Sequence, residues 1–157
     1  RFHSYSYVDI DPSLQEVSER HFLGQPLAPN KSFVVEPARA FLRRNAGAYD
    51  LIVLDAFTNR ASLPPDLITR EAFAAVHNAL APGGRVVMNT ITSPTFADRF
   101  SRSLDATIRT AFPFVTRQVL AQTVTDGAAN VLYVGSMHAA SLHDIYTDDR
   151  NRSFLDR

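Results

Sequence analysis

The segment Tyr49-Asp50-Leu51-Ile52-Val53-Leu54-Asp55 places four consecutive apolar residues between two aspartates. A continuous apolar run of this length is typical of a central strand that is buried on both faces of a parallel sheet. A carboxylate is costly to bury without partners, so we expect Asp55 to emerge at the carboxyl edge of the sheet. Ligands of open α/β sheets bind beyond that edge. The segment therefore predicts a fold class and the position of a site.

Strand-like and helix-like segments alternate on both sides of this run. Strands are predicted at residues 6–10 and 33–36, each followed by a helix. Downstream we expect a helix over residues 66–80, a turn at Pro82-Gly83-Gly84, a strand from Arg85, a helix over 96–112, and two strands joined near Asp126-Gly127. This order predicts an α/β fold with a mostly parallel sheet, helices on both faces and a C-terminal antiparallel hairpin.

Composition excludes several classes of protein. The 157 residues suffice for one domain, and 16 basic against 16 acidic residues give no net charge, which argues against a nucleic-acid surface. The absence of cysteine excludes a disulfide scaffold, a thiolate metal site and a cysteine nucleophile. The five histidines show no metal-ligand spacing, and no apolar run approaches the roughly 18 residues of a membrane-spanning helix. We therefore expect a cytoplasmic domain with no metal, no nucleic acid and no membrane crossing in this segment.

Two further aspartates lie where the first predicted strand meets its helix. A carboxylate at the position of Asp9 can accept hydrogen bonds from both hydroxyls of a ribose in nucleotide-binding α/β folds. The alternative is a solvated turn carboxylate that caps the helix starting near Pro12. Asp11 fits the cap better than the ribose role, although both remain open.

Four stretches, taken together in this order, resemble the spermidine synthase (polyamine aminopropyltransferase) family, a branch of the class I methyltransferase fold. They are Val8-Asp9-Ile10-Asp11-Pro12, the run from Tyr49 to Asp55, residues 67–73 with Leu80-Ala81-Pro82-Gly83-Gly84, and Asn130-Val131-Leu132-Tyr133-Val134. The Asp55-Ala56-Phe57 sequence is similar to that of the bacterial spermidine synthase-like group. The resemblance covers roughly residues 7–136. It implies a nucleoside-binding domain over residues 1–140 and leaves 141–157 as a polar tail.

The resemblance also implies a reaction and a set of site residues. Decarboxylated S-adenosylmethionine would act as co-substrate, and its aminopropyl group would pass to an amine acceptor in polyamine biosynthesis. Asp55 matches the aspartate that orients and deprotonates the attacking amine. Asp9, Asp11 and Glu36 match the positions that contact the nucleoside. A homodimer is the assembly that the resemblance favours, and no metal is implied.

Three departures from the family pattern leave alternatives open. Glu36-Pro37 replaces an aspartate followed by glycine or alanine, and Thr58 replaces a second aspartate three residues after Asp55, with Arg60 close by. The first strand of the fold and its glycine-rich turn would precede Arg1, so we expect a gap of one strand width between the strands that end at Asp9 and Asp55. The alternatives are a methyltransferase that uses S-adenosylmethionine itself, or a catalytically degenerate binding module.

Overall fold

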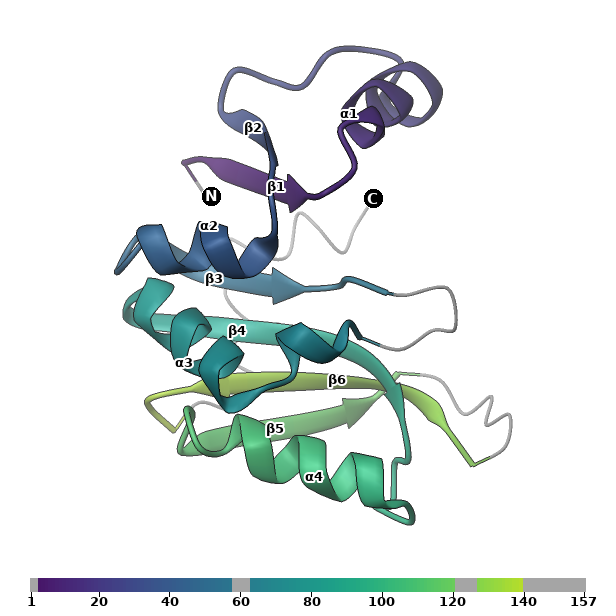
Figure 1. Cartoon of the computed structure of the whole chain (residues 1–157), viewed down its shortest axis with the longest axis vertical. Helices are drawn as coiled ribbons and strands as arrows, with labels where there is room; N and C mark the ends of the chain where they lie inside the picture. The colour runs from purple at the N-terminus through teal and green to yellow at the C-terminus, as the bar shows by residue number, and fades with distance from the viewer. Residues whose placement is uncertain (1–2, 58–62, 121–126, 140–157) are drawn as a thin grey trace.

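A computed structural model describes residues 3–57, 63–120 and 127–139 of the chain (Figure 1). In chain order its elements are β1 (Tyr5–Asp9), α1 (Ser13–Val17), the π-helix η1 (Ser18–Leu23), β2 (Lys31–Val35), α2 (Ala38–Arg44), β3 (Tyr49–Leu54), the 3-10 helix η2 (Pro65–Leu67), α3 (Arg70–Ala79), β4 (Leu80–Thr92), α4 (Arg99–Ile108), β5 (Phe114–Val119) and β6 (Ala129–Ser136). The predicted α/β class is confirmed. Among the described residues, no helix has the length and apolar character needed to span a bilayer.

The strands form two separate sheets. Strands β1 and β2 pair in parallel, and the second sheet has the order β3-β4-β6-β5. Strand β3 is parallel to β4, whereas β6 is antiparallel to both β4 and β5. The predicted C-terminal hairpin is therefore confirmed as β5 and β6, and the described strands of the rest of the fold follow the parallel β-α-β pattern.

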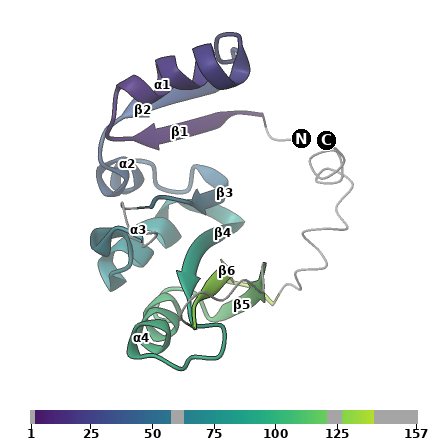
Figure 2. The same ribbon diagram turned by 90° about the vertical axis from the view of Figure 1, so that its right-hand side faces the viewer.

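Helices α3 and α4 lie on one side of the four-stranded sheet (Figure 2). The hydrophobic core lies between these helices and the sheet. Phe73 of α3, Ile108 of α4 and Met88 of β4 are fully buried in it. Strand β3 directs Ile52 and Leu54 into this core. Its intervening Val53 is 57% exposed, so the prediction that β3 is buried on both faces is wrong.

Strand β4 begins earlier than the sequence predicts. We expected Pro82-Gly83-Gly84 to form a turn before the strand, but these residues lie inside β4, which starts directly after α3. Tyr49 pairs with Leu80, and the register shifts before Leu51 pairs with Arg85. A Cβ on Gly84 would lie 2.8 Å from the Tyr49 carbonyl oxygen. The glycine therefore permits a close backbone approach within the ladder.

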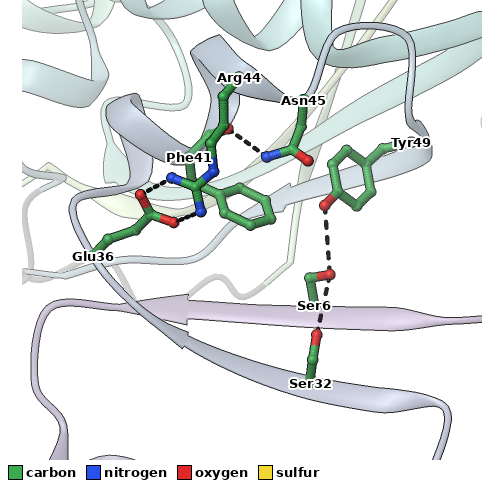
Figure 3. Close-up of polar contacts among 7 residues, drawn as sticks. All are labelled: Ser6, Ser32, Glu36, Phe41, Arg44, Asn45 and Tyr49. Atoms are coloured by element: carbon green, nitrogen blue, oxygen red, sulfur yellow. Dashed lines mark hydrogen bonds and ion pairs between the residues drawn. The ribbon is translucent and has the colours of Figure 1, made fainter.

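A break separates β1 from β3, at the place where the sequence predicts a gap. No backbone ladder joins these two strands among the residues that the structure describes. A side-chain contact spans the break: the Tyr49 hydroxyl donates to Ser6 Oγ over 3.4 Å (Figure 3). The arrows of β1 and β3 point the same way in Figure 1, so their carboxyl ends lie at the same edge of the molecule.

Gly135 of β6 offers a test of the packing between sheet and helix. A Cβ at this position would lie 2.9 Å from Val86 Cγ1 and 3.0 Å from Phe112 Cγ. We expect Gly135→Ala to lower the free energy of unfolding by about 1–3 kcal/mol through overpacking, as measured by urea denaturation. In the double variant with Phe112→Leu, the two losses should be less than additive. Strict additivity would show that Phe112 is not the clashing group.

Candidate active site

The carboxyl ends of β1 and β2 bring two of the predicted site residues together. Asp9, the last residue of β1, pairs with Val35 at the end of β2. The backbone N–H of Glu36 donates to the Asp9 carbonyl oxygen over 3.0 Å. Parallel pairing thus places Asp9 and Glu36 side by side at the edge where α/β folds bind ligands.

The side chains of Asp9 and Asp11 shape the turn into α1. Asp9 Oδ1 accepts a hydrogen bond from the Asp11 N–H at 2.9 Å. Asp11 Oδ1 accepts from the Ser13 N–H at 2.8 Å and from Ser13 Oγ at 2.6 Å. These hydrogen bonds from Ser13 lower the pKa of Asp11 below its ordinary value. Asp11 therefore braces the turn that leads through Pro12 into α1, whereas Asp9 has only one carboxylate oxygen engaged among the described contacts.

Glu36 is held by an arginine that the sequence analysis did not identify. Arg44, at the end of α2, donates from Nη1 and Nη2 to the two carboxylate oxygens of Glu36 (Figure 3). The guanidinium also lies 5.3 Å from the centroid of the Phe41 ring. Hydrogen bonding to Glu36 raises the pKa of Arg44. Glu36 is therefore an ion-pair partner within the protein, which limits its freedom to meet a nucleoside.

Asp55 occupies the position that its sequence predicts, directly after β3. Leu54 pairs with Met88 in the parallel ladder, so the next residue along each strand is Asp55 on one side and Asn89 on the other. Asn89 Nδ2 donates to Asp55 Oδ1 over 3.0 Å. The sequence analysis missed Asn89, although a polar residue after the apolar run of Val86, Val87 and Met88 is the same signal that identified Asp55.

The four residues form two pairs on either side of the break between β1 and β3. Asp9 and Glu36 belong to one sheet, and Asp55 and Asn89 belong to the other. No hydrogen bond or ion pair links the two pairs within residues 3–57, 63–120 and 127–139. In the same part of the chain, no three His, Asp or Glu side chains gather as metal ligands would. Thr58 and Arg60, and the tail from residue 141, lie outside the described residues.

Sequence comparison relates the chain to enzymes of known class. A polyamine aminopropyltransferase of Vibrio vulnificus is 34% identical over 108 residues, which are 67% of this chain and 34% of that protein. Polyamine aminopropyltransferase 2 of Pseudomonas aeruginosa is 28% identical over 110 residues, which are 67% of this chain and 32% of that protein. Over about two thirds of its length, the chain is similar in sequence to polyamine aminopropyltransferases. It spans about a third of the length of these relatives. No family model matches the chain.

Comparison with solved structures confirms the class I methyltransferase fold. A probable spermidine synthase from Corynebacterium glutamicum has a TM-score of 0.71 at 24% identity, covering 96% of this chain and 52% of that one. A spermidine synthase in complex with the transition-state analogue AdoDATO has a TM-score of 0.77 at 16% identity, with coverages of 99% and 53%. Human methyltransferase-like protein 13 in complex with SAH has a TM-score of 0.72 at 18% identity, with coverages of 98% and 72%. At these identities the likeness concerns the fold alone.

The turn at Asp11 makes a prediction about stability and pH. The pKa of Asp11 is depressed in the folded state, so its contribution is present above the unfolded pKa and is lost as the pH falls through the folded pKa. We expect the difference in urea midpoint between wild type and Asp11→Asn to be greatest above the ordinary aspartate pKa of 3.8 and to shrink as the pH falls below it. A difference that stays constant across this range would show that ionisation of Asp11 does not matter.

Proposed function

We propose that this chain forms the reaction-centre domain of a polyamine aminopropyltransferase that uses decarboxylated S-adenosylmethionine and an amine acceptor. The observation that carries the proposal is the Asp55 carboxylate. It follows β3 at the carboxyl edge, it is held there by Asn89, and it stands in a chain that is 34% identical to such an enzyme. The chain spans only about a third of the length of that relative. The activity and the substrates of this protein are therefore proposed from the site at Asp55.

The proposed reaction is an in-line displacement at the carbon next to a sulfonium. The amine nitrogen forms a bond to the propyl carbon, the carbon–sulfur bond breaks, and its electron pair returns to sulfur to give the neutral thioether methylthioadenosine. The nitrogen loses a proton, which the Asp55 carboxylate accepts and passes to solvent. The positive sulfur provides most of the driving force, so the protein chiefly orients the amine and removes the proton.

Asp9 is the proposed anchor for the nucleoside. Its carboxylate lies at the end of β1, where it would accept hydrogen bonds from the two ribose hydroxyls. Glu36 lies beside Asp9. Because its carboxylate is paired with Arg44, it would face the adenine as an ion-paired group rather than as a free carboxylate. Asp11 would act through the turn that fixes Asp9 rather than through a contact of its own.

A methyltransferase that uses S-adenosylmethionine itself is the second candidate. It is favoured by the likeness in fold to human methyltransferase-like protein 13 in complex with SAH. A binding module without activity is the third, and the Glu36–Arg44 ion pair favours it because that pair occupies a carboxylate of the proposed site. A turnover assay with decarboxylated and intact S-adenosylmethionine in parallel separates the three.

The cytoplasmic location stays a prediction from the composition, and the homodimer stays a prediction from the resemblance. Both are part of the proposal. The length of the amine acceptor is left undefined, because Thr58 stands where a second aspartate is usual. Cell fractionation and the mass of the full-length protein in solution test the first two.

Asp55→Asn should slow aminopropyl transfer strongly while leaving nucleoside binding intact. The amide cannot accept the proton of the amine, and loss of such acid–base assistance costs about a hundred- to ten-thousandfold in kcat. Affinity for methylthioadenosine, measured by calorimetry on the full-length protein, should not change. Asp50→Asn is the matched control, because Asp50 is an exposed aspartate at the opposite end of β3. Equal activity of Asp55→Asn and wild type would remove Asp55 from the reaction.

Asp9→Asn should weaken methylthioadenosine binding by about tenfold to a hundredfold, the range expected for hydrogen bonds to a charged acceptor. The change is measured by calorimetry on the full-length protein. Asp50→Asn again serves as the control. Unchanged affinity in Asp9→Asn would mean that the nucleoside lies elsewhere.

A further inference from the structure

The contact between Asn89 and Asp55 joins two strands at the centre of the candidate site. Asn89 lies on β4, 34 positions from Asp55 in sequence, and reaches it through a 3.0 Å hydrogen bond from Nδ2 to Oδ1. A carboxylate only accepts hydrogen bonds, so the amide must present its nitrogen. This bond fixes one oxygen of Asp55 and therefore the plane of its carboxylate.

Asn89 lies within an interior strand of the sheet, whereas Asp55 is the first residue of a loop. Asn89 is flanked by Met88 and Thr90, both fully buried, and it is paired across the sheet with Leu132 of β6. A side chain carried by an interior strand is positioned more accurately than one carried by a loop. We therefore expect Asn89 to set the orientation of the Asp55 carboxylate, and not the reverse.

The donor is neutral, and this matters for an amine substrate. The ion pairs found among the described residues involve Glu16, Glu36 and Asp105, and none includes Asp55. An arginine or lysine in place of Asn89 would form an ion pair with Asp55 and compete with an incoming ammonium group for the carboxylate. An amide orients the carboxylate and leaves its charge for the substrate.

Asn89 also has a feature that its contribution to the fold does not explain. Its Oδ1 is buried and has no hydrogen-bond partner among the described residues. A buried acceptor without a partner lowers stability, and an apolar side chain of similar shape avoids that cost. Such groups in native proteins often have a functional reason. Here the reason would be the hydrogen bond that the other end of the same amide gives to Asp55.

We infer that Asn89 is a positioning residue, which holds the Asp55 carboxylate in the orientation that receives the proton of the attacking amine. The inference rests on the proposed function for its effect on the reaction. The contact itself is independent of that function.

The experiment compares Asn89→Leu and Asn89→Gln with wild type in the full-length protein. For Asn89→Leu we expect kcat to fall about tenfold to a hundredfold, the cost of a misplaced catalytic group, while KM for the nucleoside and affinity for methylthioadenosine stay unchanged. The thermal midpoint should stay the same or rise, because the unpaired acceptor is removed. Asn89→Gln keeps the donor and should recover part of kcat.

Asn130→Leu is the matched control. Asn130 lies on the neighbouring strand β6, paired with Ile91, and also has a buried Oδ1 without a described partner. It makes no described hydrogen bond to Asp55, so its loss should leave kcat unchanged. A kcat for Asn89→Leu equal to wild type, or a fall matched by Asn130→Leu, would overturn the inference.

A second readout separates this inference from the proposed function. The side-chain NH2 resonances of Asn89 in NMR spectra should shift from their wild-type positions when Asp55 is replaced by alanine. They should keep their wild-type positions in Asp50→Ala. If the protein transfers no aminopropyl group to any amine tested, the proposed function fails, and these resonances still report whether Asn89 holds Asp55. Resonances that do not respond to Asp55→Ala would refute the contact.

Discussion

The parallel pairing of β3 with β4 is the constraint on which the candidate site depends. Its register sets Leu54 against Met88, and the residues that follow are Asp55 and Asn89. A slip of one residue would turn every side chain of one strand to the other face. The burial of Ile52 and Leu54 beneath the helices disfavours such a slip of β3, because it would expose both side chains. Hydrophobic packing on one face thus fixes polar geometry at the edge.

The sequence predicted those parts of the site that depend on one strand alone. An apolar run followed by a carboxylate identified the strand end at Asp55, and an alternating strand that ends in acidic residues identified Asp9. For Asn89 the local signal existed, but its partner Asp55 is set by the register of β3 against β4, which the sequence of one strand does not state. Arg44 was missed because its partner Glu36 lies at the other end of α2, and no short motif links the two. Asp11 was expected near the start of the helix, because an aspartate before a helix start is a local signal, and it accepts hydrogen bonds from Ser13 in the turn before α1.

The fold was predicted in its order of elements and less well in its burial and boundaries. Leu51 and Val53 were expected inside the sheet because apolar runs usually are, yet burial depends on what covers a face, and the sequence of the strand does not state that. Pro82-Gly83-Gly84 has the composition of a turn. It lies within β4 because Tyr49 pairs with Leu80 before the shift, and a tertiary contact overrides the local preference.

The break between β1 and β3 leaves two strand edges whose backbone groups have no partner strand among the described residues, next to an exposed valine and leucine. An unpaired strand edge can bind any extended peptide, because its free N–H and C=O groups form hydrogen bonds with the backbone of that peptide. An extended segment that paired with both edges would join the two sheets into one, with the carboxyl ends of β1 and β3, and hence Asp9 and Asp55, in a single row.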